Sequence, residues 1–485
     1  MKLLNVKKIF HLSRHRSTVQ GALDVSNIGK SLKVHGWVKA ARKQRVNTFI
    51  DIDDGLVIGG QRLQIVVPTD KVSRSLDYHT FVQAEGILKK SPLKGQEVEL
   101  EAEQIEVITP VQDKYPFQPR KRYDDELPRS YPQYRAKLND FAALLRIRSR
   151  LSKSIHDYFH DNDYVQIHTP ILTSNDCEGA GELFQVSPAN KDISVKMKNN
   201  NVADLDEAYF NKKAFLTVSG QLHLEAMCNG LEQVYTFHPA FRAEMGRTRR
   251  HLCEFSMIEA EKIIYNDDLD QLLQLQESMI KRALQSTMDT HVGDIVNFLK
   301  LNSLKHKSKK NEIDQSIGHV EKVLKEPFKV LSYKEAFDIL EKHQDEFETR
   351  PDRAKGLGKE HEIFLVEHCD RVPIFVINWP KATKAFYARQ CSDNEDLVSA
   401  VDLLFPNVGE MAGGSLREHN YDVLKNNIDS AGIEGMEWYL DLRQNGAAPM
   451  GGFGLGFERL VQFVLKVYNI RDAVPFPRRP HECRL

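Results

Sequence analysis

The chain has 485 residues, of which 41% are hydrophobic and 28% charged, and its formal net charge at pH 7 is −1. This length predicts two or three domains, and no apolar run reaches the roughly 20 residues that a membrane span requires. A net charge near zero excludes a protein that binds nucleic acid through its overall charge, so any RNA contact must come from local patches.

The first 23 residues contain five lysines and arginines and no acidic residue. This composition is typical of a mitochondrial presequence, although a basic tail that contacts RNA would have the same composition. We therefore expect a presequence at 1–23 and a location in the mitochondrial matrix, with the cytoplasm as the alternative. The six cysteines include no Cys-x-x-Cys pair, which argues against a zinc ribbon or a redox dithiol.

Residues 24–112 alternate between apolar and polar side chains with a period of two, as at Leu32, Val34 and Val38. Such alternation, interrupted by turn residues like Asp53-Asp54-Gly55, predicts about five short, half-buried strands. Five strands of this length suit an OB-like barrel, an architecture that often binds single-stranded nucleic acid.

A second, larger domain is expected after a hinge at 113–137, where four prolines exclude a long helix. Apolar residues recur at helical spacing over 138–159 and 269–284, and a short strand is expected at 164–170. Residues 189–213 are polar and are expected to form a surface insertion. Strands and helices alternate from Lys329 onward, which predicts an α+β domain over 138–485.

Several familiar catalytic motifs are absent from the sequence, among them a complete Walker A loop, His-Glu-x-x-His and Gly-x-Ser-x-Gly. Two other segments stand out. In 234–259, Arg242 and Glu244 are two residues apart and so share one face of a strand. In 449–464, a glycine-rich strand leads into a helix with Arg459 near its N-terminus, a combination that favours a phosphate. A surface ion pair beside a basic hairpin would explain the first segment but not the second.

These segments carry a resemblance to a known family. Phe241-Arg-Ala-Glu244, Arg250-His-Leu-Cys-Glu-Phe255 and Gly454-Leu-Gly-Phe-Glu-Arg459 resemble motifs 2 and 3 of the class II aminoacyl-tRNA synthetases, and His168-Thr-Pro170 resembles their motif 1, a dimer element. Residues 32–110 resemble the anticodon-binding barrel of the aspartate, asparagine and lysine subgroup. The resemblance implies a catalytic domain with an antiparallel sheet flanked by helices, and a homodimer.

The resemblance also implies the site residues. Arg242 and Arg459 would be the catalytic pair, with Arg242 on the α-phosphate of ATP and the substrate carboxylate, and Arg459 on the γ-phosphate. The implied ATP contacts are Arg242, Glu244, Arg250, His251, Phe255, Glu410, Gly456 and Arg459. Asp402 and Glu410 would bind Mg²⁺. Because the substrate carboxylate is itself the nucleophile, no catalytic triad is required.

Several stretches, such as Val218-Ser-Gly-Gln-Leu-His-Leu-Glu225, resemble the asparagine branch of the subgroup. The aspartate branch has a lysine where Leu224 stands. Glu225 could accept a hydrogen bond from an asparagine side-chain amide and repel an aspartate, and Arg417 could donate to the amide oxygen. L-asparagine and tRNA(Asn) are thus the implied substrates, and the implied amino-acid contacts are Glu178, Gln221, Glu225, Arg242 and Arg417. An aspartate enzyme, perhaps one that charges two tRNAs, and an inactive RNA-binding paralogue remain as alternatives.

By the same resemblance, the barrel would recognise the anticodon through Phe49, Gln64 and Glu99, although packing or solvation explains these residues as well. The sequence departs from the family pattern at three places. Met450 stands where the family usually has histidine, Ser256 stands where bacterial-type asparagine enzymes usually have tryptophan, and 479–485 replaces the usual small-residue ending.

Overall fold

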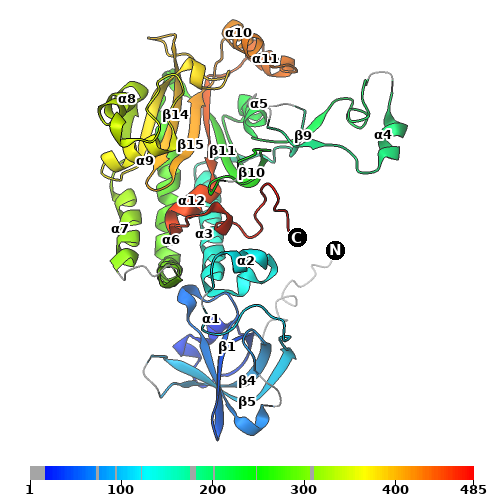
Figure 1. Cartoon of the computed structure of the whole chain (residues 1–485), viewed down its shortest axis with the longest axis vertical. Coiled ribbons are helices and arrows are strands. Elements are labelled where there is room, and N and C mark those ends of the chain that lie inside the picture. Colours follow the sequence, from blue (N-terminus) through cyan, green and yellow to red (C-terminus); the bar gives the residue numbers. More distant parts are fainter. Residues whose placement is uncertain are drawn as a thin grey trace, which may run out of the picture. The chain divides into compact units, whose positions relative to one another are not determined.

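The computed structural model describes residues 17–72, 76–92, 95–121, 123–174, 182–199, 202–246, 248–305 and 311–485, with the side chains of 311–316 excepted. The chain divides into two compact units (Figure 1). The first comprises 1–149 with 289–313, and the second 150–288 with 314–485. The helices α3 (Asn139–Asp161) and α6 (Asp270–Lys305) each have residues in both units, so the second unit begins later than the residue 138 expected from the sequence.

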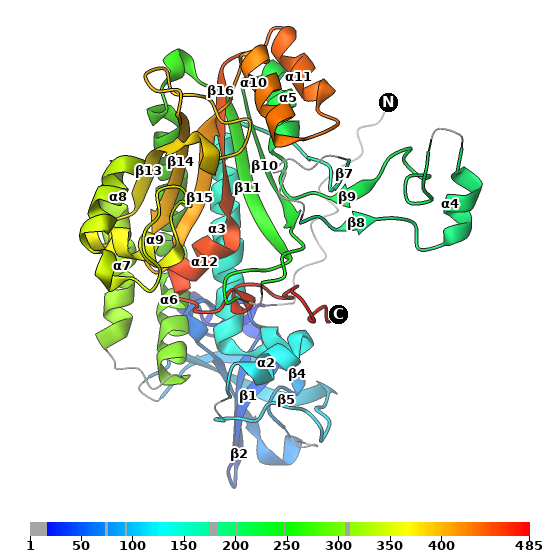
Figure 2. The same cartoon turned by 45° about the horizontal axis from the view of Figure 1, so that its top comes forward.

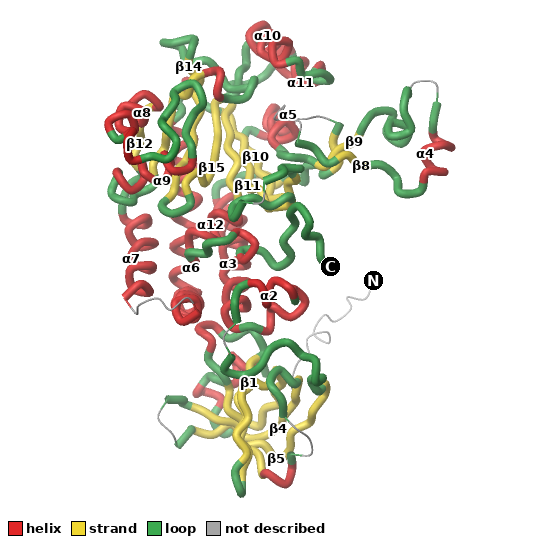
Figure 3. Tube along the Cα trace, in the orientation of Figure 1, coloured by secondary structure: helices red, strands yellow, loops and turns green. Residues whose placement is uncertain are grey.

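The first unit contains a closed five-stranded barrel (Figure 3). Its strands follow one another in the order β1-β2-β3-β5-β4, with β3 and β5 parallel and the other pairs antiparallel. The strands are β1 (Ser31–Lys43), β2 (Asn47–Asp53), β3 (Leu63–Pro68), β4 (Phe81–Lys90) and β5 (Val98–Thr109). The predicted OB-like barrel is confirmed.

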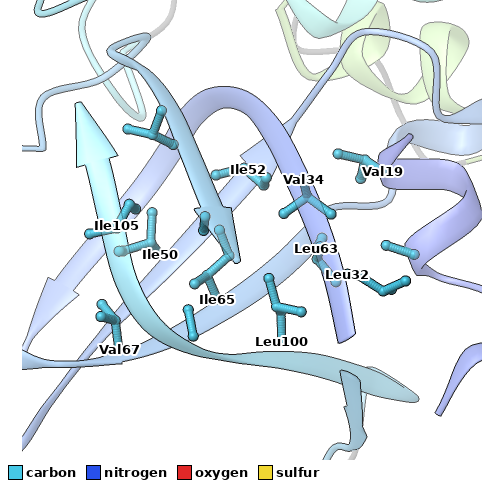
Figure 4. Packing of buried hydrophobic residues seen from close by; sticks show 14 of the residues in the cluster. Val19, Leu32, Val34, Ile50, Ile52, Leu63, Ile65, Val67, Leu100 and Ile105 are labelled. Carbon is cyan, nitrogen blue, oxygen red and sulfur yellow. The ribbon is translucent and has the colours of Figure 1, made fainter. Parts of the chain in front are cut away.

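The barrel interior is filled by the apolar members of the alternating pattern. Ile50, Leu63, Ile65 and Leu100 are fully buried, and their side chains point toward one another in Figure 4. Successive strand residues face opposite sides of the sheet, so the polar residues between them, such as Asp51, lie on the outer face.

The barrel begins earlier than the sequence suggested. Helix α1 (Val19–Ala22) is capped by the Thr18 hydroxyl, which accepts the Gly21 N–H at 3.0 Å. Val19 and Ala22 are fully buried in the barrel core, and the Val19 N–H donates to Asp54 at 2.8 Å. The barrel domain therefore begins before the predicted residue 24, and cleavage after residue 23 would remove these core residues. The presequence itself stays a prediction. Residues 1–16 of that presequence lie outside the described residues.

The segment expected to be a hinge is packed against itself by aromatic side chains. It contains the short helix α2 (Glu126–Ser130). Tyr115 meets Tyr134 edge-on with a centroid distance of 5.2 Å, and Phe117 is buried.

The second unit is built on an eight-stranded sheet, seen in Figure 2, whose six central strands are antiparallel. In spatial order the strands are β12 (Lys329–Ser332), β13 (Ile374–Pro380), β14 (Leu397–Phe405), β15 (Gly409–Leu416), β16 (Met450–Gly456), β11 (Glu254–Ile263), β10 (Gln233–Phe241) and β6 (Val165–Gln166). The predicted antiparallel sheet flanked by helices is confirmed.

Four helices position the sheet strands that carry the site. They are α5 (Gln221–Leu231) on β10 and β11, α8 (Tyr333–Lys342) on β12 and β13, α9 (Lys359–His368) on β14 and β15, and α12 (Phe457–Leu465) on β11. Helix α8 illustrates the local logic: Ser332 and Glu335 form a capping box, and buried Tyr333, Phe337 and Leu340 recur at helical spacing.

The remaining elements lie around this sheet. They are α7 (Asn311–Lys325), α10 (Tyr421–Ala431), α11 (Glu437–Gln444) and a small sheet of β7 (Leu172–Thr173), β9 (Ala214–Leu216) and β8 (Gln185–Val186). The insertion with α4 (Lys191–Met197) extends away from the large sheet in Figures 1 and 2. Within the described ranges, no helix combines the length and apolar character needed to cross a membrane.

Candidate active site

Arg242 follows β10 directly and is held by the neighbouring strand. Its N–H donates to the Cys253 carbonyl at 3.0 Å, which extends the pairing of β10 with β11 beyond Phe241. The guanidinium lies over the Phe255 ring, with its central carbon 5.5 Å from the ring centroid. His251, on the loop between the strands, lies 3.6 Å from the Glu244 carboxylate.

Arg459 lies in the first turn of α12, opposite the start of β15. Its Nη1 donates to the Glu410 carbonyl at 2.7 Å and lies 3.5 Å from the Glu410 carboxylate. The Glu458 carboxylate accepts the Ser256 N–H of β11 at 3.0 Å. These contacts fix the N-terminus of α12 beside the motif 2 strands.

The eight residues predicted to contact ATP all line one cavity of the second unit. They are Arg242, Glu244, Arg250, His251, Phe255, Glu410, Gly456 and Arg459. Three guanidinium groups and the N-terminus of α12 favour an anion. The Phe255 ring offers a face for stacking a base. The cavity therefore has the chemistry of a nucleotide polyphosphate site, while the separate roles of its residues stay predictions.

A second cavity adjoins the first. Arg242, Met257, Glu410 and Gly454 line both cavities. Of the other predicted residues, the second cavity includes Gln221, Asp402 and Arg417, together with Ser219, Glu259 and Tyr387. Arg242 thus lies at the junction of the two cavities, where its guanidinium could contact a ligand in each.

Arg417 lines the second cavity and is only 3% exposed. Its guanidinium is held by hydrogen bonds to buried neighbouring residues. Its Nε donates to Glu261 at 3.2 Å, its Nη2 donates to the other oxygen of Glu261, and its Nη1 donates to the Ser415 hydroxyl at 2.9 Å. Glu261 occupies one edge of the guanidinium, so the substrate can use only the opposite edge. Sequence reasoning missed Glu261, whose signal is an acid two residues after Glu259, on the same face of the strand.

The glycines of β16 leave room for the side chains of the neighbouring strand β11. A β-carbon at Gly452 would overlap the Glu261 carboxyl group and the Ala260 carbonyl, and one at Gly454 would lie 2.7 Å from the Met257 methyl group. The absence of side chains at these positions thus lets neighbouring side chains and backbone approach β16 closely. Gly456, by contrast, would make only ordinary contact with Arg459 at 3.6 Å.

Glu225 is fully buried on α5 and is not among the residues that line the second cavity. It accepts from the Tyr439 hydroxyl at 2.6 Å, from Arg443 Nη2 at 2.7 Å and from Gln221 Nε2 at 3.1 Å, and it lies 3.7 Å from Arg417. Burial would raise the pKa of Glu225, but Arg443 and Arg417 outweigh it and lower that pKa, so the side chain is ionised. Its predicted direct contact with a substrate amide stays a prediction.

Glu259 also lines the second cavity. Its carboxylate accepts from His238 Nε2 at 2.5 Å, from the Gly220 N–H at 2.7 Å and from the Ser219 hydroxyl. Burial would raise the pKa of Glu259, but the His238 contact and the other hydrogen bonds outweigh it and lower that pKa. Sequence reasoning assigned no role to this residue.

Asp402 and Glu410, the predicted metal ligands, face each other across β14 and β15. One oxygen of each lies 3.5 Å from the position that a β-carbon at Gly413 would take. Both Asp402 oxygens accept from Lys384 Nζ, at 2.6 and 2.7 Å. Burial, opposed by Lys384 and reinforced by Glu410, raises the pKa of Asp402 to about 6.

This pair suits a hard divalent cation, since Mg²⁺ commonly binds through one or two carboxylates and substrate phosphates. Over the described part of the chain, no group of three or more His, Cys, Asp and Glu side chains is arranged to hold a metal by itself. The Asp402 and Glu410 pair therefore fits Mg²⁺ bound together with nucleotide phosphates.

The three predicted anticodon contacts come together on the outer face of the barrel. Gln64 and Glu99 are register partners on β3 and β5, and Phe49 lies on β2 beside them. Gln96 Nε2 donates to Gln64 at 2.9 Å and to Glu99 at 3.2 Å, and Gln64 Nε2 donates to Asp51 at 3.3 Å. Phe49 is half-buried, and the amide of Gln64 is already engaged within this network.

Comparison with known proteins decides the family. Residues 124–480 match the model of the tRNA synthetases class II (D, K and N), and residues 32–108 match that of an OB-fold nucleic acid binding domain. An asparaginyl-tRNA synthetase of Mus musculus is 43% identical over 96% of this chain and 94% of its own length, and one of Homo sapiens is 42% identical over 98% and 96%. The chain belongs to the asparaginyl-tRNA synthetase family. The crystal structure of asparaginyl-tRNA synthetase from Pyrococcus horikoshii complexed with asparaginyl-adenylate is similar, with a TM-score of 0.81, 30% identity, and coverage of 97% of this chain and 99% of that one.

The departures from the asparaginyl-tRNA synthetase pattern leave the two cavities intact. Met450 is buried in a small apolar cluster with Leu224, Cys228 and Val234. Its carbonyl accepts the Arg417 N–H at 2.8 Å, so it supports the second cavity through its backbone. The predicted contact Glu178 lies outside the described residues.

Proposed function

We propose that this chain is an asparagine–tRNA ligase, which activates L-asparagine with ATP and transfers it to tRNA(Asn). The observation that carries the proposal is the pair of adjoining cavities that share Arg242 and Glu410. One has the features of a nucleotide site, and the other ends on Arg417. An aminoacyl-adenylate would occupy both at once, and the Pyrococcus horikoshii relative was crystallised with asparaginyl-adenylate.

In the first step, an oxygen of the asparagine carboxylate attacks the α-phosphorus of ATP and pyrophosphate leaves. Arg242, placed at the junction of the cavities, would hold the carboxylate and the α-phosphate together and stabilise the charge that develops between them. Arg459 would stabilise the leaving pyrophosphate from the N-terminus of α12. The rate gain then comes from positioning and fixed positive charge, so no protein nucleophile is needed.

Asp402 and Glu410 are the residues that would hold Mg²⁺ together with the nucleotide. When bound there, the ion would neutralise charge on the phosphates. Lys384 supplies a counter-charge to Asp402.

Arg417, together with Glu261 and Glu225 behind it, would select asparagine over aspartate. The free edge of Arg417 would donate to the side-chain amide oxygen. Glu225 supplies negative charge behind this guanidinium and Glu261 occupies its inner edge, which together lower its attraction for a substrate carboxylate. Glu225 would therefore act against aspartate through Arg417 and by repulsion.

In the second step, the terminal 3′-hydroxyl of tRNA attacks the carbonyl carbon of the adenylate and AMP leaves. The outer face of the barrel would bind the anticodon, with Phe49 stacking on a base and Gln64 and Glu99 bonding to base edges. Adjacent positions on β2, β3 and β5 support this assignment.

A homodimer and a mitochondrial location are part of the same proposal. The motif 1 region carries exposed apolar side chains, with Val165, Ile171 and Leu172 each more than 40% exposed, as expected of a surface that a second copy covers. The basic composition of the first residues supports import, with the leader ending before Thr18.

The test is ATP–pyrophosphate exchange with asparagine and with aspartate, followed by transfer to tRNA(Asn). Exchange with asparagine alone is expected. Exchange with aspartate alone would identify an aspartate enzyme, and exchange with neither would identify an inactive paralogue; both results would overturn the proposal.

A further inference from the structure

Helix α9, which lines neither of the two cavities, reaches the strand that carries Glu410. The Glu362 carboxylate accepts the Glu410 N–H at 3.0 Å and accepts from Lys359 Nζ at 2.9 Å. Lys359 Nζ also donates to the Val408 carbonyl. The two side chains, three positions apart on one face of the helix, therefore hold the turn that begins β15.

The turn is shaped to receive this contact. Gly409 has a φ of +77°, a conformation that favours glycine. A β-carbon at Gly409 would overlap both Lys359 Nζ and the Glu362 carboxylate. Any larger residue at this position would displace the two side chains. The contact between the turn and helix α9 therefore requires glycine at position 409.

The main chain of Glu410 is held from two sides as a result. Glu362 accepts its N–H, and Arg459 donates to its carbonyl at 2.7 Å. Glu410 lines both cavities, whereas Glu362 lines neither and its side chain is only 13% exposed. Glu362 therefore acts on the site through Glu410 rather than by touching a ligand.

The orientation of Glu362 is fixed at the start of α9. His361 is buried; its Nδ1 accepts the Gly358 N–H at 3.0 Å, and its Nε2 donates to the Thr349 carbonyl at 2.8 Å. Both ring nitrogens are thus engaged, and the first turn of the helix cannot rotate without breaking these bonds. Glu362 lies in this same anchored turn, and its carboxylate reaches the Glu410 N–H of β15.

From this geometry we infer that Glu362 is a positioning residue for nucleotide binding, which with Lys359 holds Glu410 and Arg459 in the arrangement that receives the phosphates of ATP. The inference rests on the proposed function, because it takes the first cavity to be the ATP site. A purely structural role would instead affect folding, or affect the two substrates equally.

The test uses the full chain and the variants Glu362→Ala, Glu362→Gln and Glu360→Ala. Glu360 is the matched control, since it lies on the same helix and its carboxylate likewise accepts from the main chain, here the N–H groups of Glu348 and Thr349 at 2.9 and 2.7 Å. Binding of a non-hydrolysable ATP analogue with Mg²⁺ is measured by calorimetry. The KM values for ATP and asparagine are measured by pyrophosphate exchange.

Glu362→Ala is expected to weaken analogue binding about tenfold, the effect of losing one charge-assisted hydrogen bond, and to leave the KM for asparagine within about twofold. Glu362→Gln keeps an oxygen for the Glu410 N–H and should recover most of the affinity. Glu360→Ala should bind the analogue as the unmodified chain does. If Glu362→Ala does not fold, Lys359→Met is measured instead, and this variant is also expected to weaken analogue binding.

Three results would overturn the inference: unchanged analogue binding in Glu362→Ala, equal losses in Glu362→Ala and Glu360→Ala, or equal changes in both KM values. Failure of the proposed function looks different, because then the unmodified chain itself would show no exchange with asparagine. If the unmodified chain exchanges and Glu362→Ala matches it, the positioning role alone is refuted.

Discussion

Replacing Glu225 by glutamine tests how the second cavity excludes aspartate. The change keeps the size of the side chain and removes one negative charge from a fully buried position. Glu225 lies 3.7 Å from Arg417 Nε, so a substrate carboxylate bound on the far side of that guanidinium would lie about 9 Å from Glu225, allowing about 2 Å across the guanidinium and about 3 Å for the new hydrogen bond. At an effective dielectric constant near 20, removal of the repulsion is worth about 2 kcal/mol.

Glu225→Gln is therefore expected to raise kcat/KM for aspartate relative to asparagine by about 30-fold. The assay is pyrophosphate exchange with each amino acid at saturating ATP. The variant should also unfold more easily, by about 3–5 kcal/mol, because Arg443 loses its buried counter-ion. Thermal unfolding measured beside the kinetics separates these two effects.

Tyr439→Phe is the matched control. It removes the hydroxyl that donates to Glu225 at 2.6 Å and changes no charge. It should cost about 1–2 kcal/mol of stability and leave the ratio of aspartate to asparagine within about twofold. An unchanged ratio in Glu225→Gln, or an equal shift in Tyr439→Phe, would refute the electrostatic account of selectivity.

The other predictions concern β16 and the barrel. Gly452→Ala should displace Glu261 and raise the KM for asparagine about tenfold in exchange assays while the KM for ATP changes little; a rise confined to ATP would contradict the role given to this glycine. Burial, together with nearby Lys39, holds the pKa of His79 down to about 2. The unfolded chain takes up that proton below about pH 6.5, so stability should fall by about 1.4 kcal/mol per pH unit below it. His79→Gln should flatten this dependence in thermal unfolding between pH 7 and 4.5, and an unaltered slope would show that other groups cause it. Phe49→Ala should lower kcat/KM for tRNA(Asn) about tenfold through lost stacking and leave pyrophosphate exchange intact; a loss in both assays would place Phe49 in folding instead.

Most residues of the first cavity could be found from the sequence because they lie in two short segments with local patterns, whereas Glu410 came from the family resemblance alone. Arg242, Glu244 and Phe255 belong to one hairpin, and Arg459 follows the glycine strand directly. All of them line the same cavity. The barrel was predictable for a related reason, since its alternating strands have a period that a single sequence displays.

The wall behind Arg417 could not be derived in this way. Arg443 and Glu225 are 218 positions apart, and no local period links α11 to α5. Glu261 required knowledge of which strand lies beside Gly452. The first pairing is set by how two distant helices pack and the second by the order of strands in the sheet, and a sequence pattern encodes neither.

The start of the barrel was misplaced for a different reason. The basic, acid-free composition of the first 23 residues dominated the prediction, and the single turn of α1 is too short to show a helical period. Only the packing of Val19 and Ala22 in the barrel core revealed that the domain begins earlier.

Pyrophosphate exchange by the unmodified full chain, measured side by side with asparagine and aspartate, tests the central claim most directly. Arg417 backed by Glu261 and Glu225 predicts exchange that depends on asparagine, with a kcat/KM for aspartate lower by about two orders of magnitude or more. Equal exchange with the two amino acids, or faster exchange with aspartate, would contradict the claim.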